Sequence, residues 1–311
     1  QENLNLFAEM EEEFGFSVEF RASGYLLLAH SEKTWTAFHK NVHLQQSLGV
    51  DVRLLDPAEC RDIVPGLCMD GLIGGAYCPG DGQAFPFAVI RGFRREIEKA
   101  GNHIITHNPV VRIDIGSPFS VTLRDGQVLE AEKLVITTGP WTAELMKSIG
   151  LDLPLFPERH EAVISERMPK ILGPMLVDYR PDGCYFQQLE SDQIIGCYTP
   201  MPNVPGIRED LSFDFLPQVA RRMVRLVPSL ENVSLLRHWS GSYTVTPDGN
   251  PIVDESPIEN LYIAAGMCGH GFMLAPAMGK HLAERMISGK WQLDFSEFAY
   301  DRVFSGEESL K

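Results

Sequence analysis

Three glycines stand close together near the end of the chain, at Gly266, Gly269 and Gly271. An apolar run at 261–265 precedes them, and an apolar-faced segment at 273–287 follows them. The pattern predicts a strand, a glycine loop and a helix, so that free backbone N–H groups and the positive end of a helix dipole point toward one place. An electron-rich group fits there, either a phosphate or the pyrimidine edge of a flavin, which gains negative charge on reduction. A connection that needs glycine only for close packing is the alternative.

This loop differs from the common phosphate-binding loops. After Gly266 and Gly269 the spacing departs from GxGxxG, and the lysine of a P-loop is missing. The segment that follows carries an i, i+4 apolar stripe, formed by Leu274, Met278, Leu282 and Met286. Such a stripe indicates a helix that buries one side against a sheet.

The elements that must position this loop alternate between two kinds. Strand–helix units fill 77–150 and 246–311, whereas 151–245 holds short alternating strands around one helix, a pattern typical of an antiparallel sheet. Residues 16–29 predict a hairpin, and Asp56 followed by Pro57 predicts a helix start. We therefore expect a mixed α/β protein with two domains, each assembled from discontinuous segments.

Composition and charge exclude several classes of function. The chain has 311 residues with 27 Lys and Arg against 42 Asp and Glu, a formal net charge of −15, so nucleic-acid binding is not expected. The six cysteines are scattered without zinc-ligand spacing, so no metal site or disulfide framework is expected. Neither a signal peptide nor an apolar run of about 18 residues is present, and we expect a cytoplasmic protein without a transmembrane segment.

Four motifs together resemble the D-amino acid oxidase/sarcosine oxidase superfamily of FAD enzymes. They are YCPGDGQAFPFAVIRGF (77–93), AEKLVITTGPWTAEL (131–145), RHWSGSYTVTPDGNPIVD (237–254) and YIAAGMCGHGFMLAPAMGK (262–280). The motifs follow the family order and span most of the chain. Within the superfamily they are most similar to sarcosine oxidase β subunits and dye-linked L-proline dehydrogenase β subunits, followed by glycine oxidase.

The resemblance implies a fold. Residues 77–150 and 246–311 would form an FAD-binding domain of Rossmann type, and residues 1–76 and 151–245 an antiparallel β-sheet substrate domain. The family's N-terminal βαβ unit, whose GxGxxG loop cradles the FAD pyrophosphate, is absent from the sequence. Because the chain also starts at Gln1, directly in a helical pattern, we expect that it begins part-way into a longer protein.

The resemblance also implies how FAD is held. Val110 would touch the adenine, and Thr138, Gly139 and Trp141 would line the flavin side. The loop would wrap the pyrimidine edge of the flavin through Gly266, Met267, Cys268, Gly269, His270, Gly271, Phe272 and Met273. Gly241 stands where some relatives carry a cysteine bonded to flavin, which implies non-covalent attachment. Met273 replaces a lysine that monomeric sarcosine oxidases use for oxygen activation, which favours a dehydrogenase.

The implied substrate is a small amino acid or amine held by its carboxylate. Tyr243 stands where glycine oxidase uses an arginine, and a phenol is a weaker anion ligand than a guanidinium. A further cation is therefore expected, from Arg159, His160, Arg237 or His238. The strands expected to roof the pocket carry Tyr185, Gln187 and Tyr198, for which a plain core or sheet-surface position is the alternative. His270 is a catalytic candidate, unless it only hydrogen-bonds the backbone of its loop.

Together these features predict FAD-dependent oxidation of the C–N bond of a sarcosine-, proline- or glycine-like compound, with hydride passing to flavin N5 and an imine as product. The electrons would pass to O2 or to an electron-transfer acceptor, and the chain would join a homo- or hetero-oligomer. Two alternatives remain open: a non-catalytic partner or scaffold, because the nucleotide unit is missing, and an anion-binding module that uses the glycine loop.

Overall fold

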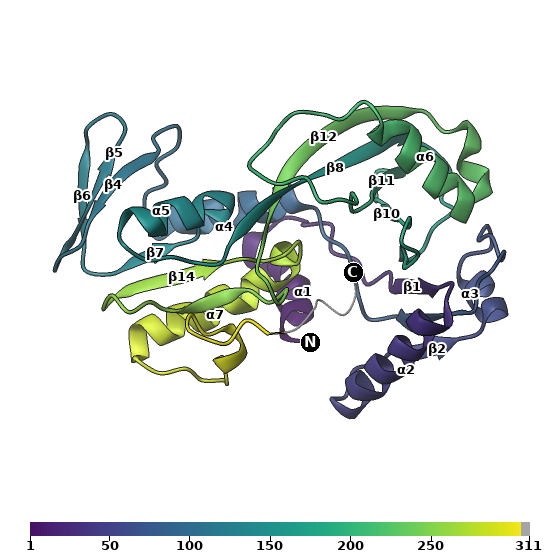
Figure 1. Cartoon of the computed structure of the whole chain (residues 1–311), viewed down its shortest axis with the longest axis horizontal. Coiled ribbons are helices and arrows are strands. Elements are labelled where there is room, and N and C mark those ends of the chain that lie inside the picture. Colours follow the sequence, from purple (N-terminus) through teal and green to yellow (C-terminus); the bar gives the residue numbers. More distant parts are fainter. Residues whose placement is uncertain (306–311) are drawn as a thin grey trace.

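The computed structural model describes residues 1–305 of the chain. Its largest part is an eight-stranded sheet with the order β12-β8-β11-β10-β9-β1-β3-β2 (Figure 1). Neighbouring strands are antiparallel except for β1 and β9, which run parallel. The strands are β1 (Tyr25–Ala29), β2 (Arg53–Leu55), β3 (Gly74–Cys78), β8 (Phe156–Arg167), β9 (Met175–Asp178), β10 (Tyr185–Gln188), β11 (Gln193–Cys197) and β12 (Leu235–Val245).

One face of this sheet, called here the packed face, is covered by helix α6 (Phe215–Leu226). Successive side chains of a strand point to opposite faces, so alternate residues of each strand enter this layer. Leu28, Leu176, Phe186 and Ile194 are fully or almost fully buried there against Phe215. Helix α3 (Pro57–Ile63) and the short helix η2 (Pro228–Asn232) complete the layer. The strand residues that alternate with these buried side chains point to the opposite face of the sheet, called here the open face.

The other half of the molecule contains two three-stranded sheets (Figure 1). One has the order β13-β14-β7, from β13 (Ile252–Glu255), β14 (Leu261–Ala265) and β7 (Leu134–Ile136), and packs on helix α7 (Gly271–Ser288). The other joins β4 (Val110–Asp114), β5 (Phe119–Leu123) and β6 (Val128–Ala131). The short helix η1 (Gly139–Trp141) and α5 (Thr142–Ser148) follow β7, and η3 (Ser296–Phe298) follows α7. The apolar stripe predicted for 274–286 is confirmed, because Met278 and Leu282 bury against Val253 and Tyr262.

Two further helices complete the chain around these layers. Helix α2 (Glu32–Ser47) lies against β1, β2 and β3. Helix α1 (Glu2–Phe14) lies instead against α4 (Pro86–Lys99) and α7. Phe7 and Phe14 are buried beside Ala88 of α4, and Asn3 Oδ1 accepts a hydrogen bond from the Ala277 N–H at 2.9 Å. The amino-terminal helix therefore packs on the glycine-loop half of the molecule.

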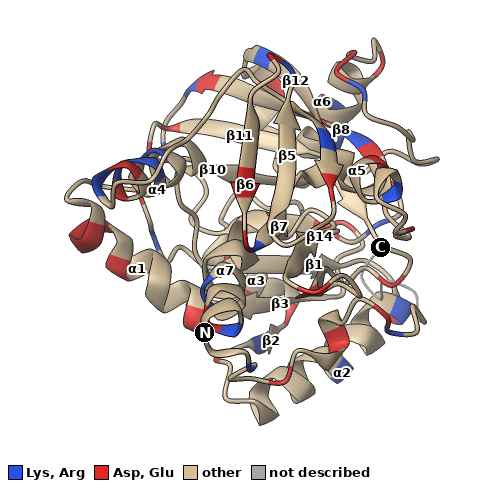
Figure 2. Ribbon diagram, turned by 90° about the vertical axis from the view of Figure 1, so that its left-hand side faces the viewer, with Lys and Arg blue, Asp and Glu red and all other residues tan. Residues whose placement is uncertain are grey.

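Acidic and basic residues are distributed unequally among the helices of one side of the molecule. Figure 2 shows acidic residues and no Lys or Arg on α1, whereas α4 and α7 carry residues of both signs. Among residues 1–305, no helix has the length and apolarity needed to cross a bilayer, and no cluster of His, Cys, Asp or Glu could hold a metal ion.

Most elements agree with the sequence patterns. The mixed α/β fold is confirmed. Asp56 begins α3 with a capping box: its carboxylate accepts from the Glu59 N–H at 2.9 Å, and the Glu59 carboxylate accepts from the Asp56 N–H at 2.8 Å. The predicted hairpin at 16–29 is wrong. Of these residues only β1 forms a strand, and an isolated bridge joins Arg21 of the preceding segment to Gln83, in the connection that follows β3. Strand β1 lies between β3 and β9 in the large sheet, and this position buries Leu26 and Leu28. A hairpin formed with residues 16–24 alone would not bury these side chains. The domain boundaries stay a prediction.

Candidate functional site

The glycine loop runs from the end of β14 to the start of α7 in a left-handed backbone. Gly266, Cys268 and Gly269 have φ values of 70°, 49° and 87°. A Cβ at Gly266 would lie 2.6 Å from the Thr246 methyl, and one at Gly269 would lie 2.5 Å from the Tyr243 ring. Glycine is therefore required at both positions, by backbone conformation and by the close approach of β12.

Residues 246–250, which follow β12, pack against the glycine loop and hold it in place. The Thr246 hydroxyl donates to the Asn250 carbonyl at 2.8 Å, and Asp248 forms a buried ion pair with Arg302 at 2.8 Å. The Thr246 N–H lies 3.4 Å from Cys268 Sγ, and the Cys268 N–H donates to the Thr244 carbonyl at 3.0 Å. The Thr-Pro-Asp-Gly motif thus fixes the turn on which the glycine loop rests.

A cavity of about 680 Å³, called here the loop cavity, opens beside the glycine loop. Its walls come from the end of β12, from the β7–η1 connection, from the loop itself and from one side of α7. The lining is mostly backbone, small side chains and apolar side chains: Gly139, Pro140, Ser242, Tyr243, Gly266, Met267, Cys268, Gly269, Gly271, Phe272, Ala275 and Gly279 are among its residues. Pockets of this size and character hold small-molecule ligands and cofactors.

Helix α7 brings polar backbone groups to this cavity. His270 precedes the helix and gives no side-chain cap, and the first N–H groups of a helix have no partner within it. These groups and the helix dipole favour an electron-rich ligand at Gly271 and Phe272, which line the cavity. The packing-only alternative for the glycine loop is therefore not favoured, because the loop borders open space on one side.

On the open face of the large sheet, Tyr243 lines this cavity and meets a second phenol, that of Tyr185. The Tyr185 and Tyr243 hydroxyls are 3.3 Å apart, and the His160 ring stacks on Tyr243 with 3.9 Å between centroids. Burial raises the pKa of both tyrosines, so each keeps its proton at neutral pH. The pair can therefore donate hydrogen bonds to an anionic group such as a carboxylate.

Sequence reasoning missed further polar residues on this face. Tyr25 pairs with Cys78 across β1 and β3, and burial raises the Tyr25 pKa, with Tyr179, Asp81 and Tyr243 adding to the rise. Burial likewise raises the pKa of Asp81. Cys197, beside Tyr185, has a thiol pKa raised by burial to about 11. The one signal available was a tyrosine at the head of the otherwise apolar run YLLLA at 25–29.

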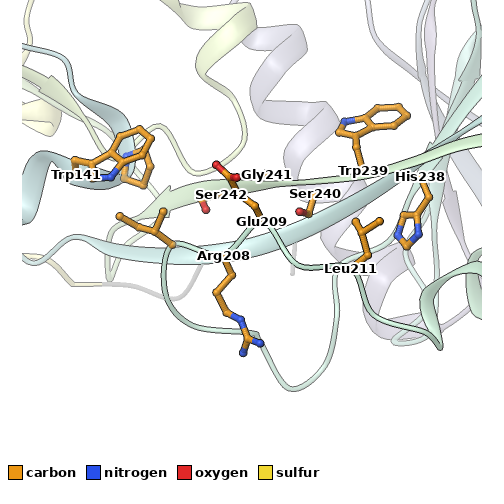
Figure 3. A pocket seen from close by; sticks show the side chains of 11 residues that line it. Trp141, Arg208, Glu209, Leu211, His238, Trp239, Ser240, Gly241 and Ser242 are labelled. Atoms are coloured by element: carbon orange, nitrogen blue, oxygen red, sulfur yellow. The ribbon is translucent and has the colours of Figure 1, made fainter. Parts of the chain in front are cut away.

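The structure gathers most of the residues predicted at the flavin and leaves some apart. Gly139, Gly266, Met267, Cys268, Gly269, Gly271 and Phe272 line the loop cavity. His270 and Met273 are exposed at the start of α7, and Thr138 bonds to Thr142 at 3.1 Å immediately before η1. Val110 is on β4, in a different sheet. Trp141 borders a second cavity, together with Trp239 and Leu211 (Figure 3).

Predicted substrate ligands fall on both faces of the sheet. Gln187 shares the open face with Tyr185, because the two alternate with the buried Phe186 and Gln188 along β10. Tyr198 instead stacks on Phe215 of α6, with 4.9 Å between centroids. Its predicted place in the pocket roof is not supported, and its core alternative fits this packing.

The expected cations are also distributed unequally. Arg159 is buried on the packed face, where its guanidinium pairs with Asp210 at 2.7 Å and approaches Glu161 at 3.8 Å. His238 stacks on Phe215 and lies 3.5 Å from Glu161, and Arg237 is exposed. Arg159 therefore does not face the loop cavity, because neighbouring residues of a strand point to opposite faces. Of the four candidates, His160 is the one stacked on Tyr243.

One cavity is surrounded by the glycine loop, by the N-terminus of helix α7 and by the phenol of Tyr243. This arrangement, on an α/β scaffold, is that of a flavin-type site. Residues 1–285 match the family described as "DAO: FAD dependent oxidoreductase", so the chain belongs to this family. The family resemblance inferred from the motifs is confirmed.

Individual relatives agree with this assignment. Sarcosine oxidase subunit beta of Rhizobium meliloti is 28% identical over 98% of this chain and 74% of its own length. Glycine oxidase of Geobacillus kaustophilus is 26% identical over 96% of this chain and 78% of its own length. Among solved structures, L-proline dehydrogenase from P. horikoshii superposes with a TM-score of 0.89 at 29% identity, covering 96% of this chain and 80% of that one.

The loop cavity fits part of the FAD that the family uses. Glycines without Cβ atoms form the wall that a flat ring would approach, and a Cβ on Gly139 would meet nothing within 4 Å. Backbone N–H groups and a helix N-terminus face the same space, which suits the end of a flavin that becomes negative on reduction. The residues named above as lining the loop cavity would hold the flavin, which accepts the hydride when bound.

Proposed function

We propose that this chain oxidises the C–N bond of a small amino acid or secondary amine, of the sarcosine, proline or glycine type, with FAD as acceptor. The observation that carries the proposal is the meeting of the glycine loop and Tyr243 at one cavity, with the Tyr185 hydroxyl 3.3 Å from that of Tyr243. The names of the relatives support the substrate class, since they include a glycine oxidase, a sarcosine oxidase subunit and an L-proline dehydrogenase.

We assign separate tasks to the residues around the cavity. Tyr243 and Tyr185 would donate hydrogen bonds to the substrate carboxylate, and the His160 ring would hold Tyr243 in place by stacking. Gln187, on the same face, would contribute a further polar contact. These groups position the amine carbon, and the buried walls exclude water from it. We keep His270 and Met273 as proposed contacts at the entrance, because both lie at the exposed start of α7.

We further propose that FAD is held without a covalent bond. Gly241 offers no side chain at the position where some relatives use cysteine. Residues 77–150 and 246–311 would hold the cofactor, and 1–76 and 151–245 the substrate, with α1 as an exception because it packs on α7. Release of all the flavin on acid denaturation would support non-covalent attachment, and flavin that stays with the protein would contradict it.

Electron transfer from the reduced enzyme is the next part of the proposal. Because Met273 stands where oxygen-activating relatives use lysine, we propose a dehydrogenase that favours an electron-transfer acceptor over O2. One relative is named as a subunit, which supports assembly with other chains. Light scattering on the purified protein measures that assembly.

Anaerobic titration tests the central proposal. The protein is loaded with FAD and mixed in turn with sarcosine, L-proline and glycine, and loss of the visible flavin absorbance is expected with at least one amine. Succinate, a carboxylate without an amine, serves as the matched control and should leave the spectrum unchanged. Protein that takes up no FAD would indicate a non-catalytic partner, and bound FAD that no amine reduces would contradict the substrate class.

A further inference from the structure

A second cavity, called here the tryptophan cavity, has no role in the chemistry assigned above. It has a volume of about 540 Å³ and lies along β12, between η1 and the loop 207–211. Figure 3 shows Trp141 toward one end and Trp239 toward the other, with Gly241, Ser240 and Ser242 between them. Pro140 and Ser242 line this cavity and the loop cavity alike, so one thin wall separates the two.

The lining suits a flat, neutral ring. Trp141 and Trp239 leave 54% and 40% of their surface exposed, a large apolar area for a protein to present to water. Gly241 keeps the space between them clear, because a Cβ there would meet nothing within 4 Å. Aromatic rings gain most when they stack on a second ring, so two half-exposed indoles beside an empty gap favour a planar ligand.

Polar groups in the same cavity suit carbonyl oxygens. Ser240 and Ser242 line the cavity from the face of β12 opposite to Trp239, because successive residues of a strand alternate, and β12 is the outermost strand of its sheet. An edge strand presents backbone N–H groups that no neighbouring strand uses. Hydroxyl and amide donors along one wall match the oxygens of a quinone.

The charges argue against an amino acid as the occupant. Arg208, which lines the cavity, is held by Asp210 through two hydrogen bonds of 2.7 and 2.8 Å. Glu209 adds a carboxylate to the same wall. For a substrate carboxylate, the Arg208 guanidinium is already paired with Asp210, and the Glu209 carboxylate would repel it. A neutral ring needs no counter-charge and is not repelled.

We propose that the tryptophan cavity binds the electron acceptor, a small neutral quinone that stacks on Trp239. Only the shared lining residues Pro140 and Ser242 would separate it from the loop cavity. This inference rests on the proposed function. The quinone gains two electrons and two protons to become a hydroquinone, and the FAD that the amine had reduced returns to its oxidised form. The substrate imine leaves from the loop cavity, so amine and acceptor need not exchange places.

Direct binding tests the cavity without turnover. Menadione is added to the protein and tryptophan fluorescence is recorded, with correction for menadione absorbance. Saturable quenching is expected, and Trp239→Ala should weaken the apparent affinity about tenfold, the factor that corresponds to loss of one good stacking contact. Leu236→Ala, an exposed residue on the same strand outside the lining, is the matched control and should bind as the unaltered protein does. Equal quenching in the Trp239→Ala and unaltered proteins would overturn the proposal.

Separate half-reactions distinguish this inference from the proposed function. In Trp239→Ala, anaerobic reduction by the amine should keep its rate, while the KM for menadione should rise about tenfold and Trp239→Phe should restore most of the loss. A rise in the amine KM with an unchanged menadione KM would make the cavity a substrate entrance and overturn the proposal. If no amine reduces the flavin, the proposed function fails, and the fluorescence titration still decides whether the cavity binds a quinone.

Discussion

On the open face of β8 and β12, Tyr243 stacks on His160 and meets Tyr185 beside the loop cavity. One residue along β8, Arg159 points to the packed face, where Asp210 and Glu161 surround it. Both faces hold tyrosines, a histidine and charged groups, but Tyr243 of the open face lines the loop cavity, whereas His238 and Ser240 of the packed face line the tryptophan cavity. A side chain's role in this protein therefore depends on which side of the strand it occupies, and residue type alone does not decide it.

The two faces also differ in how their polar groups are satisfied. On the packed face Glu161 accepts from the Ser212 N–H and hydroxyl at 2.5 Å each, and Asp178 is fully buried against Arg180 at 2.7 Å. The polar groups of the packed face are therefore bonded to one another, and these contacts stabilise the fold. On the open face burial keeps the phenols protonated, and the Tyr185 hydroxyl lies near both Tyr243 and Cys197. Tyr243, which lines the loop cavity, is the phenol placed to bind an incoming anion.

The largest effect is expected where the glycine loop meets the open face. Gly269→Val should abolish FAD retention, because its Cβ would lie 2.5 Å from the Tyr243 ring and φ there is +87°. Flavin bound per chain, measured by absorbance after gel filtration, reports the result. Gly173→Ala is the control, since its Cβ meets nothing within 4 Å and its backbone is not left-handed. Normal flavin content in Gly269→Val would count against the loop as the flavin site.

On the packed face the expected loss is of stability. Arg159→Met should lower the free energy of unfolding by about 3 kcal/mol, because it leaves Glu161 buried without its arginine. Urea denaturation measures the change. Arg208→Met removes an exposed arginine from the same Asp210 and should cost less than about 1 kcal/mol. A raised amine KM in Arg159→Met with normal stability would place Arg159 at the substrate after all.

Acid should act on the packed face through Asp178. Hydrogen bonds from His30 and Arg180 outweigh burial and lower the Asp178 pKa from 3.8 to about 2. The folded-state pKa lies below the unfolded one, so the carboxylate stabilises the protein above pH 4, and that stability is lost as pH falls toward 2. The loss amounts to about 2 kcal/mol. Urea midpoints measured between pH 5 and 2 should fall less steeply in Asp178→Asn, and parallel curves would remove Asp178 as the cause.

The smallest expected effect comes from removing a single tyrosine hydroxyl from either face. Tyr243→Phe should raise the amine KM about tenfold, equivalent to about 1.4 kcal/mol, with flavin content unchanged, because only a donor to the substrate carboxylate is removed. Tyr198→Phe, on the packed face against Phe215, should leave the KM unaltered. Steady-state kinetics with the amine that bleaches the flavin compares them. Equal KM values for the two variants would erase the proposed difference between the faces.

Local patterns predicted the glycine loop, its flanking strand and helix, and the capping box of α3, because each depends on residues close together in the chain. The sequence also placed Tyr185, Gln187 and Tyr198 on strands expected to roof the pocket, and strand alternation separates neighbouring residues of one strand onto two faces. It could not tell which face was open, since that depends on where α6 packs. For this reason the sequence could not decide between the pocket and the core alternatives for Tyr198, which stacks on Phe215. Tyr25 and Asp81 were missed because their surroundings depend on residues far away in the chain.

The ion pair between Asp248 and Arg302 joins the turn beneath the glycine loop to the segment that follows the last helix. That segment returns across the molecule, and its guanidinium also bonds to the Asn250 carbonyl at 2.7 Å. A ribosome must therefore synthesise the chain through Arg302 before the glycine loop can gain this support. A product that stops before Arg302 would hold its loop without that anchor.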